Sequence, residues 1–449
     1  MTVYINRVLN MKKIKAIGFD MDHTIVRYKT RKFESLTYKT LVEKLVKQKD
    51  YPASIRKLRY NFKRVIQGLM IDMRYGNLIK ISRFGKVKRS YHGTKPIDFK
   101  KQNEIYSSVA IDPRDDHIVP LDTSFSLAHG ILFAQLVDLK DDGARLPSYQ
   151  QITDDLQQML DEAHTSGELK EKVSLNLEKY IIQDPEIVRT LEKLKSHKRK
   201  LILITNSDYS YTKLLLDYAI GPFLENHESW KDLFHIIITL ARKPNFFIEN
   251  QSFLKVDHLT GLMSNMTGPI GNGIYQGGGA SKLQEYLGMK GEEILYIGDH
   301  IYGDVVKIKK QSNWRTALVV EPLFDEINSL FQVKTVQKKI DCFMNDKREL
   351  EVELNKLYSR KNRDEYKVKK MFVKIEKIDS EVARLIKSYQ KAFNSYWGEL
   401  MRAGQEESFF ADQVERYACI YMPRITDLLD YSPRTYFRPS RRLLAHEMI

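Results

Sequence analysis

The sequence predicts an α/β fold: a doubly wound, Rossmann-like core with a parallel sheet, an inserted cap and a helical C-terminal region. Two observations predict it. Four short apolar runs each end in polar or charged residues, and helical patterns separate these runs. Strands that alternate with helices form a parallel sheet, and ligands bind beyond the carboxyl ends of its strands. We therefore expect the four sets of polar residues at one sheet edge.

The first apolar run, residues 14–19, ends in Asp20-Met21-Asp22-His23-Thr24. Alternate side chains of a strand share a face, so Asp20 and Asp22 should point the same way, with the Met21 carbonyl exposed between them. One carboxylate can attack phosphorus while the other handles the proton of the leaving group. The alternative is an ordinary acidic turn after a buried strand.

The second and third runs supply phosphate-binding groups. Residues 201–204 lead into Thr205 and Asn206, where a hydroxyl and backbone N–H groups at a helix N-terminus could hold a phosphate. Residues 235–240 precede Lys243, and the proline that follows disfavours helix there. An ammonium is therefore expected at the end of this strand.

The fourth run, residues 294–298, ends in the acids Asp299 and Asp304. Carboxylates suit a hard cation such as Mg²⁺, which takes a few of them and keeps its waters. Each of the four turns alone is also compatible with a plain connection between strand and helix. Their coincidence at one edge favours phosphoryl chemistry.

Longer strings in these segments resemble the cytosolic purine 5'-nucleotidases, a family of the haloacid dehalogenase superfamily of phosphohydrolases. The resemblance runs in order over about residues 15–330, with a weaker echo in FADQVERYA from Phe410. It is carried by GFDMDHTIVRYK from Gly18, YGNLIK from Tyr75, LKEKVSLNLEKY from Leu169, TNSDYSYT from Thr205, ARKPNFF from Ala241 and LYIGDHIYGD from Leu295.

The resemblance implies a hydrolase core of residues 1–30 and 181–333. It makes Asp20 the nucleophile that forms an aspartyl phosphate, and Asp22 the acid and then the base. Thr205 and Asn206 match residues that hold phosphoryl oxygens, and Lys243 matches the cation that neutralises them. The expected Mg²⁺ site comprises Asp20, Met21, Asp22, Asp299 and Asp304, with Asp20, the Met21 carbonyl and Asp299 as direct ligands.

The family match also implies a base pocket. Phe125 aligns with an aromatic residue that stacks on the purine, and its alternative is a core phenylalanine. Asp161, His164 and Lys170 match contacts to a 6-oxopurine nucleotide, and the first two share a helix face within residues 153–164. A solvated helix face is the alternative. The arginine of the family in this helix is Gln157 here, which puts that contact in doubt.

A nucleotide effector site is implied by four further matches. Tyr302 and Lys310 follow the metal acids, while Gln413 and Tyr417 lie in the echo segment. An aromatic ring, an ammonium and an amide suit base stacking, phosphate binding and base-edge contact. The alternative is ordinary packing of the last helices on the core.

The remaining segments predict a cap and a helix pair. Residues 31–180 are too long for a simple crossover and should form a cap partly interleaved with the core. Residues 334–449 form the expected helical C-terminal region, in which apolar residues at heptad spacing predict two helices over 336–396, joined near 359–365. They either pack as amphipathic helices on the core or form a coiled coil.

Composition limits the setting and the partners. The 449 residues have 42% hydrophobic residues and a net charge of +15, and residues 1–100 carry 25 Lys and Arg against 7 Asp and Glu, or +18. Nucleic acid is one partner for such a surface, although an amphipathic helix over 39–64 explains much of the charge. No apolar run reaches the length of a membrane span, the N-terminus lacks a signal-peptide core, and Cys342 and Cys419 form no disulfide framework. We expect a cytoplasmic homo-oligomer with no membrane partner.

The combined prediction is a Mg²⁺-dependent 5'-nucleotidase that hydrolyses purine nucleoside monophosphates, IMP and GMP, with phosphotransferase activity through its covalent intermediate. Two alternatives remain. A phosphatase of the same fold could act on another phosphate ester, because fold does not fix substrate. A non-catalytic nucleic-acid-binding protein would use the basic N-terminal hundred residues, although the carboxylates and Lys243 disfavour it.

Overall fold

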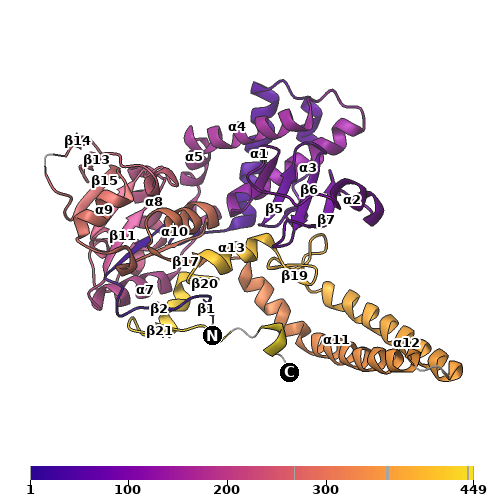
Figure 1. The fold of residues 1–449 in the computed structure, drawn as a ribbon. Helices are drawn as coiled ribbons and strands as arrows, with labels where there is room; N and C mark the ends of the chain where they lie inside the picture. Colours follow the sequence, from indigo (N-terminus) through magenta and orange to yellow (C-terminus); the bar gives the residue numbers. More distant parts are fainter. Residues whose placement is uncertain (1, 267, 360–363, 442–443, 448–449) are drawn as a thin grey trace. The chain divides into compact units, whose positions relative to one another are not determined.

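The computed structural model describes residues 2–266, 268–359, 364–441 and 444–447 (Figure 1). The chain divides into two compact units, the first comprising Met1–Glu321 and Met401–Ile449 and the second Pro322–Leu400. None of the described helices is both long enough and apolar enough to cross a membrane.

The first unit is built on a ten-stranded sheet with the order β1-β20-β17-β16-β3-β11-β12-β15-β13-β14. Strands β20 to β15 in this order are parallel, whereas β1, β13 and β14 are each antiparallel to their neighbours. The bounds are β1 Tyr4–Ile5, β3 Ala16–Phe19, β11 Lys200–Ile204, β12 Ile236–Thr239, β13 Phe253–Val256, β14 Met263–Asn265, β15 Gly273–Gly277, β16 Ile294–Gly298, β17 Arg315–Val319 and β20 Ile420–Met422.

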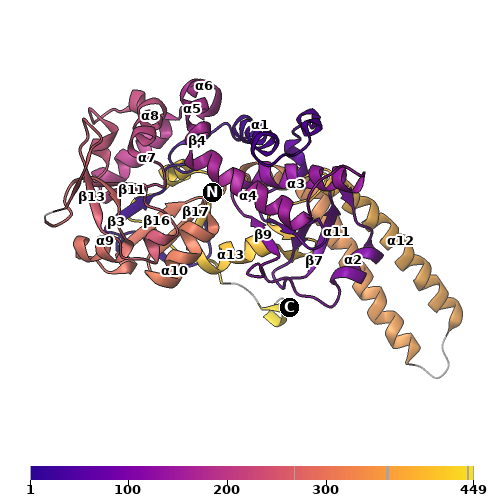
Figure 2. The same cartoon turned by 90° about the horizontal axis from the view of Figure 1, so that it is seen from above.

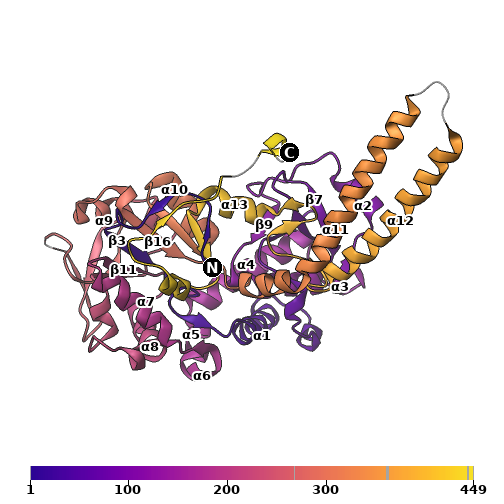
Figure 3. The same cartoon turned by 90° about the horizontal axis from the view of Figure 1, so that it is seen from below.

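Helices cover both faces of this sheet. Figures 2 and 3 show α7 (Pro185–Ser196) and α8 (Tyr209–Ala219) on one face, and α9 (Ala280–Leu287) and α10 (Lys307–Gln311) on the other. The strands are buried on both sides, so their apolar runs are continuous: Leu203 packs into one core and Ile204 into the other. The predicted doubly wound α/β core is confirmed.

An inserted segment leaves the core after β4 (Arg27–Tyr28) and returns at β10 (Ile181–Ile182), and these two strands pair antiparallel. The expected cap range 31–180 lies between them. The segment holds an antiparallel sheet of order β8-β7-β6-β5-β9 and a group of helices. Its elements are α1 Thr30–Gln48, β5 Leu69–Asp72, β6 Asn77–Ile81, β7 Val87–His92, β8 Lys95–Pro96, α2 Phe99–Tyr106, β9 Ile118–Leu121, α3 Leu127–Asp141, α4 Tyr149–Thr165, α5 Glu168–Ser174 and α6 Leu177–Tyr180.

The second unit is an antiparallel pair of long helices, α11 (Leu323–Tyr358) and α12 (Glu365–Gln390). Leu354 and Leu357 of α11 pack on Val368 and Met371 of α12, as the heptad pattern predicts. The expected junction near 359–365 includes residues 360–363, which lie outside the described residues. The second helix ends six residues earlier than the pattern suggests, because the Asn394 side chain accepts the backbone N–H groups that follow it and forms a turn.

The final residues differ from the expected helical region 334–449. Residues 401–449 belong to the first unit, and the long helices begin at Leu323. This segment forms β18 (Arg402–Ala403), β19 (Glu406–Glu407), α13 (Phe409–Tyr417) and β21 (Tyr436–Phe437), which pairs with β2 (Leu9–Asn10). Its strand β20 adds to the main sheet beside β17, a pairing over about a hundred residues that local periodicity does not encode.

Candidate active site

The candidate site lies at the carboxyl edge of four adjacent parallel strands. Asp20 follows β3, Thr205 follows β11, Lys243 follows β12 and Asp299 follows β16. The order β16-β3-β11-β12 places these strand ends side by side. All four predicted segments therefore reach one edge of the sheet, as the sequence indicated.

Lys243 holds two of the acids together. Its Nζ lies 2.7 Å from Asp20 Oδ1 and 2.9 Å from Asp304 Oδ1, and it donates a 3.0 Å hydrogen bond to the Tyr296 hydroxyl. The lysine side chain is only 6% exposed. A buried ammonium with three oxygen partners is fixed in position, so Lys243 can neutralise added negative charge only at this place.

Burial dominates the titration of these groups. It raises the pKa of Asp20 to about 7, against the lowering effect of Lys243, and Asp304 raises the value further. Burial, followed by Asp20 and Asp304, raises the pKa of Asp299 well above its ordinary value. For Lys243, burial lowers the pKa, but Asp20 and Asp304 more than offset this and leave it well above the usual range. The site thus contains more buried negative charge than its lysine balances.

Three of these carboxylates could hold a metal ion. Asp20, Asp299 and Asp304 each offer an oxygen, and the three oxygens lie within 4.8 Å of one another. Asp304 also accepts the His300 backbone N–H at 3.2 Å. A Cβ at Gly298 would lie 2.4 Å from Asp304 Oδ2, so glycine lets this carboxylate approach the strand. An all-oxygen, anionic donor set is the kind that Mg²⁺ prefers.

Asp22 has a separate environment and is not in this group of three. The Tyr28 hydroxyl donates to its Oδ1 at 2.6 Å, and the Ser207 hydroxyl donates to its Oδ2 at 3.2 Å. Burial raises the pKa of Asp22, while these two hydrogen bonds lower it. The carboxyl group therefore has no direct contact with the ammonium and faces two hydroxyl groups.

The Met21 carbonyl does not have the expected exposed orientation. It accepts the backbone N–H groups of Ile25 at 2.9 Å and Val26 at 2.8 Å, and its residue is fully buried. A carbonyl oxygen has two lone pairs, and both are engaged here. Met21 as a direct metal ligand is therefore a correction to the sequence prediction. The chain turns back at His23, whose φ is 55°. The alternation of side chains along a strand does not predict this turn.

Thr205 and Asn206 are both at the site, with different partners. The Thr205 side-chain oxygen accepts the Ser207 backbone N–H at 3.1 Å. The Asn206 amide accepts the Lys243 backbone N–H at 2.6 Å and donates to the Lys243 carbonyl at 3.0 Å. Asn206 thus fixes the loop that carries Lys243, so its contribution includes positioning this cation.

Two of the predicted base-pocket residues, Phe125 and His164, are in contact with each other. The Phe125 ring makes edge contacts with His164 at 5.5 Å, His23 at 4.5 Å and Tyr28 at 6.0 Å between ring centroids. Tyr28 is the residue that contacts Asp22, so this aromatic cluster adjoins the site. Burial, and then Lys170, lower the pKa of His164 to about 4, which leaves its imidazole neutral.

The two charged residues of the base pocket have polar partners already. Asp161 is exposed on α4 and accepts a 3.0 Å hydrogen bond from Gln157, the residue that replaces the family arginine. Lys170 lies on α5, not on the same helix, and its Nζ donates to Asp208 at 2.7 Å. Asp208 caps α8, the helix that follows Thr205, so Lys170 also lies near the carboxyl edge of the sheet.

The four predicted effector residues are partly brought together. The Lys310 Nζ lies 5.6 Å from the centre of the Tyr417 ring, and Gln413 is one turn earlier on the same helix. Tyr302 is exposed, in a π-helical turn over Ile301–Val306, with the Lys307 Nζ 4.8 Å above its ring. The helices α10 and α13 thus contribute to one surface of the first unit.

Three residues at the site escaped the sequence analysis: Tyr28, Ser207 and Tyr296. Tyr28 and Ser207 are inside the family-like strings, but no spacing rule links them to Asp22. Tyr296 is the one hydroxyl-bearing residue of the otherwise apolar β16, and this could have marked it.

Comparison with known proteins agrees with this geometry. A model of the 5' nucleotidase family matches residues 3–449. A 5'-nucleotidase domain-containing protein of Dictyostelium discoideum is 27% identical over 99% of this chain and 74% of its own length. The human 5'-nucleotidase domain-containing protein 2 is 26% identical over 99% of this chain and 85% of its own length.

Solved structures with similarity include a predicted phosphoglycolate phosphatase from Haemophilus somnus, with 13% identity, a TM-score of 0.30, and coverage of 69% of this chain and 86% of the other. A HAD phosphatase from Thermococcus onnurineus has 16% identity and a TM-score of 0.26, with coverage of 69% and 87%.

Proposed function

Since the chain belongs to the 5' nucleotidase family, we propose that it hydrolyses 6-oxopurine nucleoside 5'-monophosphates, IMP and GMP, with Mg²⁺. The observation that carries the proposal is the meeting of Asp20, Lys243, Asp299 and Asp304 at one strand edge, beside the separately held Asp22. Phosphoryl transfer depends mostly on positioning and charge neutralisation, which this arrangement supplies.

In the first step, an Asp20 carboxylate oxygen attacks phosphorus and forms an aspartyl phosphate while the bond to the ribose 5'-oxygen breaks. Asp22 donates its proton to that oxygen, so the nucleoside leaves neutral. Its raised pKa suits this role, because burial favours the protonated acid. Lys243 neutralises charge on the phosphoryl oxygens, and the Thr205 hydroxyl and nearby backbone N–H groups donate hydrogen bonds to them.

In the second step, Asp22 is a carboxylate and takes a proton from water, whose oxygen attacks the aspartyl phosphate. The bond between Asp20 and phosphorus breaks, inorganic phosphate leaves and both carboxyl groups return to their starting states. A nucleoside hydroxyl in place of water would instead give a new nucleotide, which is the basis of the proposed phosphotransferase activity.

Mg²⁺, when bound, would neutralise the phosphate and stabilise charge in the transition state. Asp20 and Asp299 would hold it, with Asp304 nearby. The main-chain ligand assigned to Met21 passes in our proposal to the Asp22 carbonyl, which accepts no backbone hydrogen bond among those found in the described part of the chain. Asp22 thus keeps its expected place at the metal through its backbone, with its side chain left for proton transfer.

Base selection is proposed to rest on Phe125, Asp161, His164 and Lys170. Phe125 and His164 are in contact and border the cluster at Tyr28, and Asp161 is one turn before His164 on α4. A neutral imidazole and a carboxylate can pair with the polar edge of a purine, and an aromatic face can stack on it. The second candidate function is a phosphatase for another phosphate ester. It would use the same carboxylates and lysine, so only the four base-pocket residues favour a nucleotide substrate over another ester.

The test is a substrate panel of IMP, GMP, AMP, CMP and p-nitrophenyl phosphate, each with Mg²⁺ and with EDTA. We expect IMP and GMP to have the highest kcat/KM and EDTA to abolish turnover. Asp20→Asn should abolish hydrolysis, whereas Asp72→Asn, which makes the same change at a buried carboxylate in the second sheet, should not. Equal kcat/KM for all substrates would contradict the base pocket, and an active Asp20→Asn would contradict the covalent mechanism.

Three further proposals concern setting and control. Tyr302, Lys310, Gln413 and Tyr417 would bind a purine triphosphate that activates the enzyme, supported by the contact between Lys310 and Tyr417. A homo-oligomer is testable by light scattering of the purified chain. A cytoplasmic location is supported by the two cysteines, which are both unpaired.

A further inference from the structure

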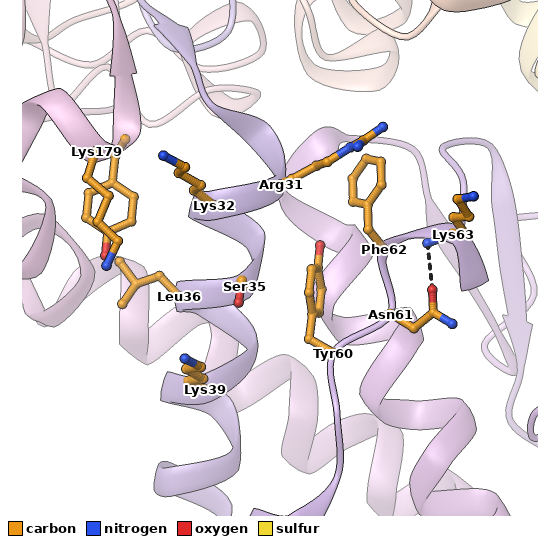
Figure 4. A pocket seen from close by; sticks show the side chains of 11 residues that line it. Arg31, Lys32, Ser35, Leu36, Lys39, Tyr60, Asn61, Phe62, Lys63 and Lys179 are labelled. Carbon is orange, nitrogen blue, oxygen red and sulfur yellow. Dashed lines mark hydrogen bonds between the residues drawn. The ribbon is translucent and has the colours of Figure 1, made fainter.

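A pocket of about 610 Å³ opens where the chain passes from the core into the inserted segment (Figure 4). Among the described residues that line it, five carry positive charge and none is acidic. We call it the basic pocket and define it by these cations, Arg31, Lys32, Lys39, Lys63 and Lys179. Such a concentration of one charge in a hollow attracts anions.

The start of α1 adds to this potential. Helix N-termini have positive partial charge and unpaired N–H groups, and acidic side chains usually occupy the first turn. Here the first turn contains no acidic residue, and Lys29 at the N-cap makes no side-chain cap. Arg31 and Lys32 are therefore placed where a cation is unfavourable unless an anion is bound.

The cations of the basic pocket lie around the hollow. Lys32 and Lys39 share one face of α1 with Ser35 (Figure 4). The Arg31 guanidinium lies 5.0 Å from the centre of the Phe62 ring, and the Lys179 Nζ lies 5.1 Å from that of Tyr180. None of these four cations forms an ion pair within the part of the chain that the structure describes.

We propose that the basic pocket binds a polyphosphate anion, either the phosphate chain of a nucleoside triphosphate or inorganic polyphosphate. The volume matches small-molecule sites, which usually span 300 to 1,000 Å³ or so. The cations come from three separate segments and surround a hollow, whereas a nucleic acid backbone usually follows an extended stripe. Several lysine and arginine side chains around one hollow can each form a charge-assisted hydrogen bond with a different phosphate group of a linked chain.

The position of the basic pocket ties it to the junction between core and insert. The Lys29 N–H donates to the Tyr180 carbonyl at 2.7 Å, and Tyr28 pairs with Ile181 in the two crossing strands. An anion that contacts both Arg31 and Lys179 would therefore join the outgoing and returning segments. Tyr28, which contacts Asp22, is three residues before Arg31. The basic pocket shares no lining residue with the proposed effector site.

Calorimetric titration of the full chain with sodium tripolyphosphate and with GTP, both in EDTA, tests this proposal. Lys32→Glu/Lys39→Glu should weaken binding at least about tenfold, because each contact between ammonium and phosphate is charge-assisted. The control Lys47→Glu/Lys101→Glu changes two exposed lysines outside the basic pocket by the same charge and should bind as the wild type. Lys310→Ala should also bind normally. Circular dichroism checks the fold of each variant.

Hydrogen exchange locates the ligand independently of activity, so failure of the proposed hydrolysis would leave this test intact. Tripolyphosphate should slow exchange in residues 29–33 and 178–182. Equal affinity for tripolyphosphate and GTP identifies the phosphate chain as the recognised part, and tighter binding of GTP identifies a nucleoside triphosphate. Undiminished binding in Lys32→Glu/Lys39→Glu, equal loss in both double variants, or a single-stranded RNA that binds tighter than either anion would overturn the proposal.

Discussion

The Tyr28 hydroxyl donates a hydrogen bond to the Asp22 carboxylate, and removal of this hydroxyl has a calculable effect on the pKa of Asp22. The Tyr28→Phe change deletes the 2.6 Å hydrogen bond to Asp22 Oδ1, while the ring keeps its contacts with His23 and Phe33. A hydrogen bond to a charged group is worth roughly 1.5 to 3 kcal/mol. Because one pKa unit corresponds to about 1.36 kcal/mol, the pKa of Asp22 should rise by about 1 to 2 units.

The direction follows from the form that the hydrogen bond favours. Tyr28 donates to the carboxylate and lowers the pKa of Asp22, so its loss favours the protonated acid. The first proposed step needs that acid, and the alkaline limb of log kcat/KM for IMP reports its titration in the free enzyme. This limb should therefore move to higher pH by about 1 to 2 units. Titration of the substrate phosphate is common to both enzymes and cancels in the difference.

Two variants calibrate the result. Ser207→Ala removes a longer bond of 3.2 Å to the same carboxylate and should shift the limb in the same direction by less. Tyr38→Phe removes an equally buried hydroxyl that donates to the neutral Gln135 amide, and should leave the limb in place. An unmoved or lowered limb in Tyr28→Phe would refute the assignment of Asp22 as the general acid.

Three other predictions address charge and specificity. Burial raises the pKa of Glu34 to about 8 against the lowering effect of the Ala128 N–H, so its contribution to stability is present below pH 4.5 and is lost as pH rises through 8. The difference between 4.5 and about 8 corresponds to at most roughly 5 kcal/mol of unfolding free energy. Urea unfolding at pH 5 and pH 9 should show this loss of stability in the wild type but not in Glu34→Gln, and an equal loss in both proteins would contradict the prediction. Lys243→Met should lower kcat for IMP by about 10² to 10³ at saturating Mg²⁺, and an unchanged kcat would exclude Lys243 from charge neutralisation. Asp161→Ala should lower kcat/KM for IMP about tenfold and leave that for AMP unchanged, so an equal loss for both would remove Asp161 from base recognition.

The location of the candidate site was predictable because parallel strands give a simple rule. Once β3, β11, β12 and β16 are recognised as neighbouring parallel strands, their terminal residues must meet, and Asp20, Lys243, Asp299 and Asp304 do. The rule needs only local apolar runs and the order of elements. It gives the location of a side chain at the edge, but not the hydrogen bonds that the side chain makes there.

The orientation of backbone groups was less accessible from sequence. The alternation of side chains along a strand suggested a free Met21 carbonyl. In the structure, the turn that begins at this residue brings two backbone N–H groups into hydrogen bonds with that carbonyl. Asn206 remains a proposed contact to phosphoryl oxygens, but its two hydrogen bonds to the Lys243 backbone were not foreseen from the sequence. Strand β20 could not be foreseen, because its partner β17 lies about a hundred residues earlier in the chain.

The different partners of Asp20 and Asp22 explain why two carboxylates of one tripeptide can have different roles. Lys243 can only donate hydrogen bonds, so its 2.7 Å contact favours Asp20 as an anion, which is the form that our proposed first step requires. The hydroxyls of Tyr28 and Ser207 can donate to a carboxylate or accept from a carboxylic acid, so they suit Asp22 in both states. A group that gives up a proton in one step and takes one in the next needs partners of this second kind. The two roles therefore cannot be exchanged without exchanging the surroundings, even though the side chains are identical.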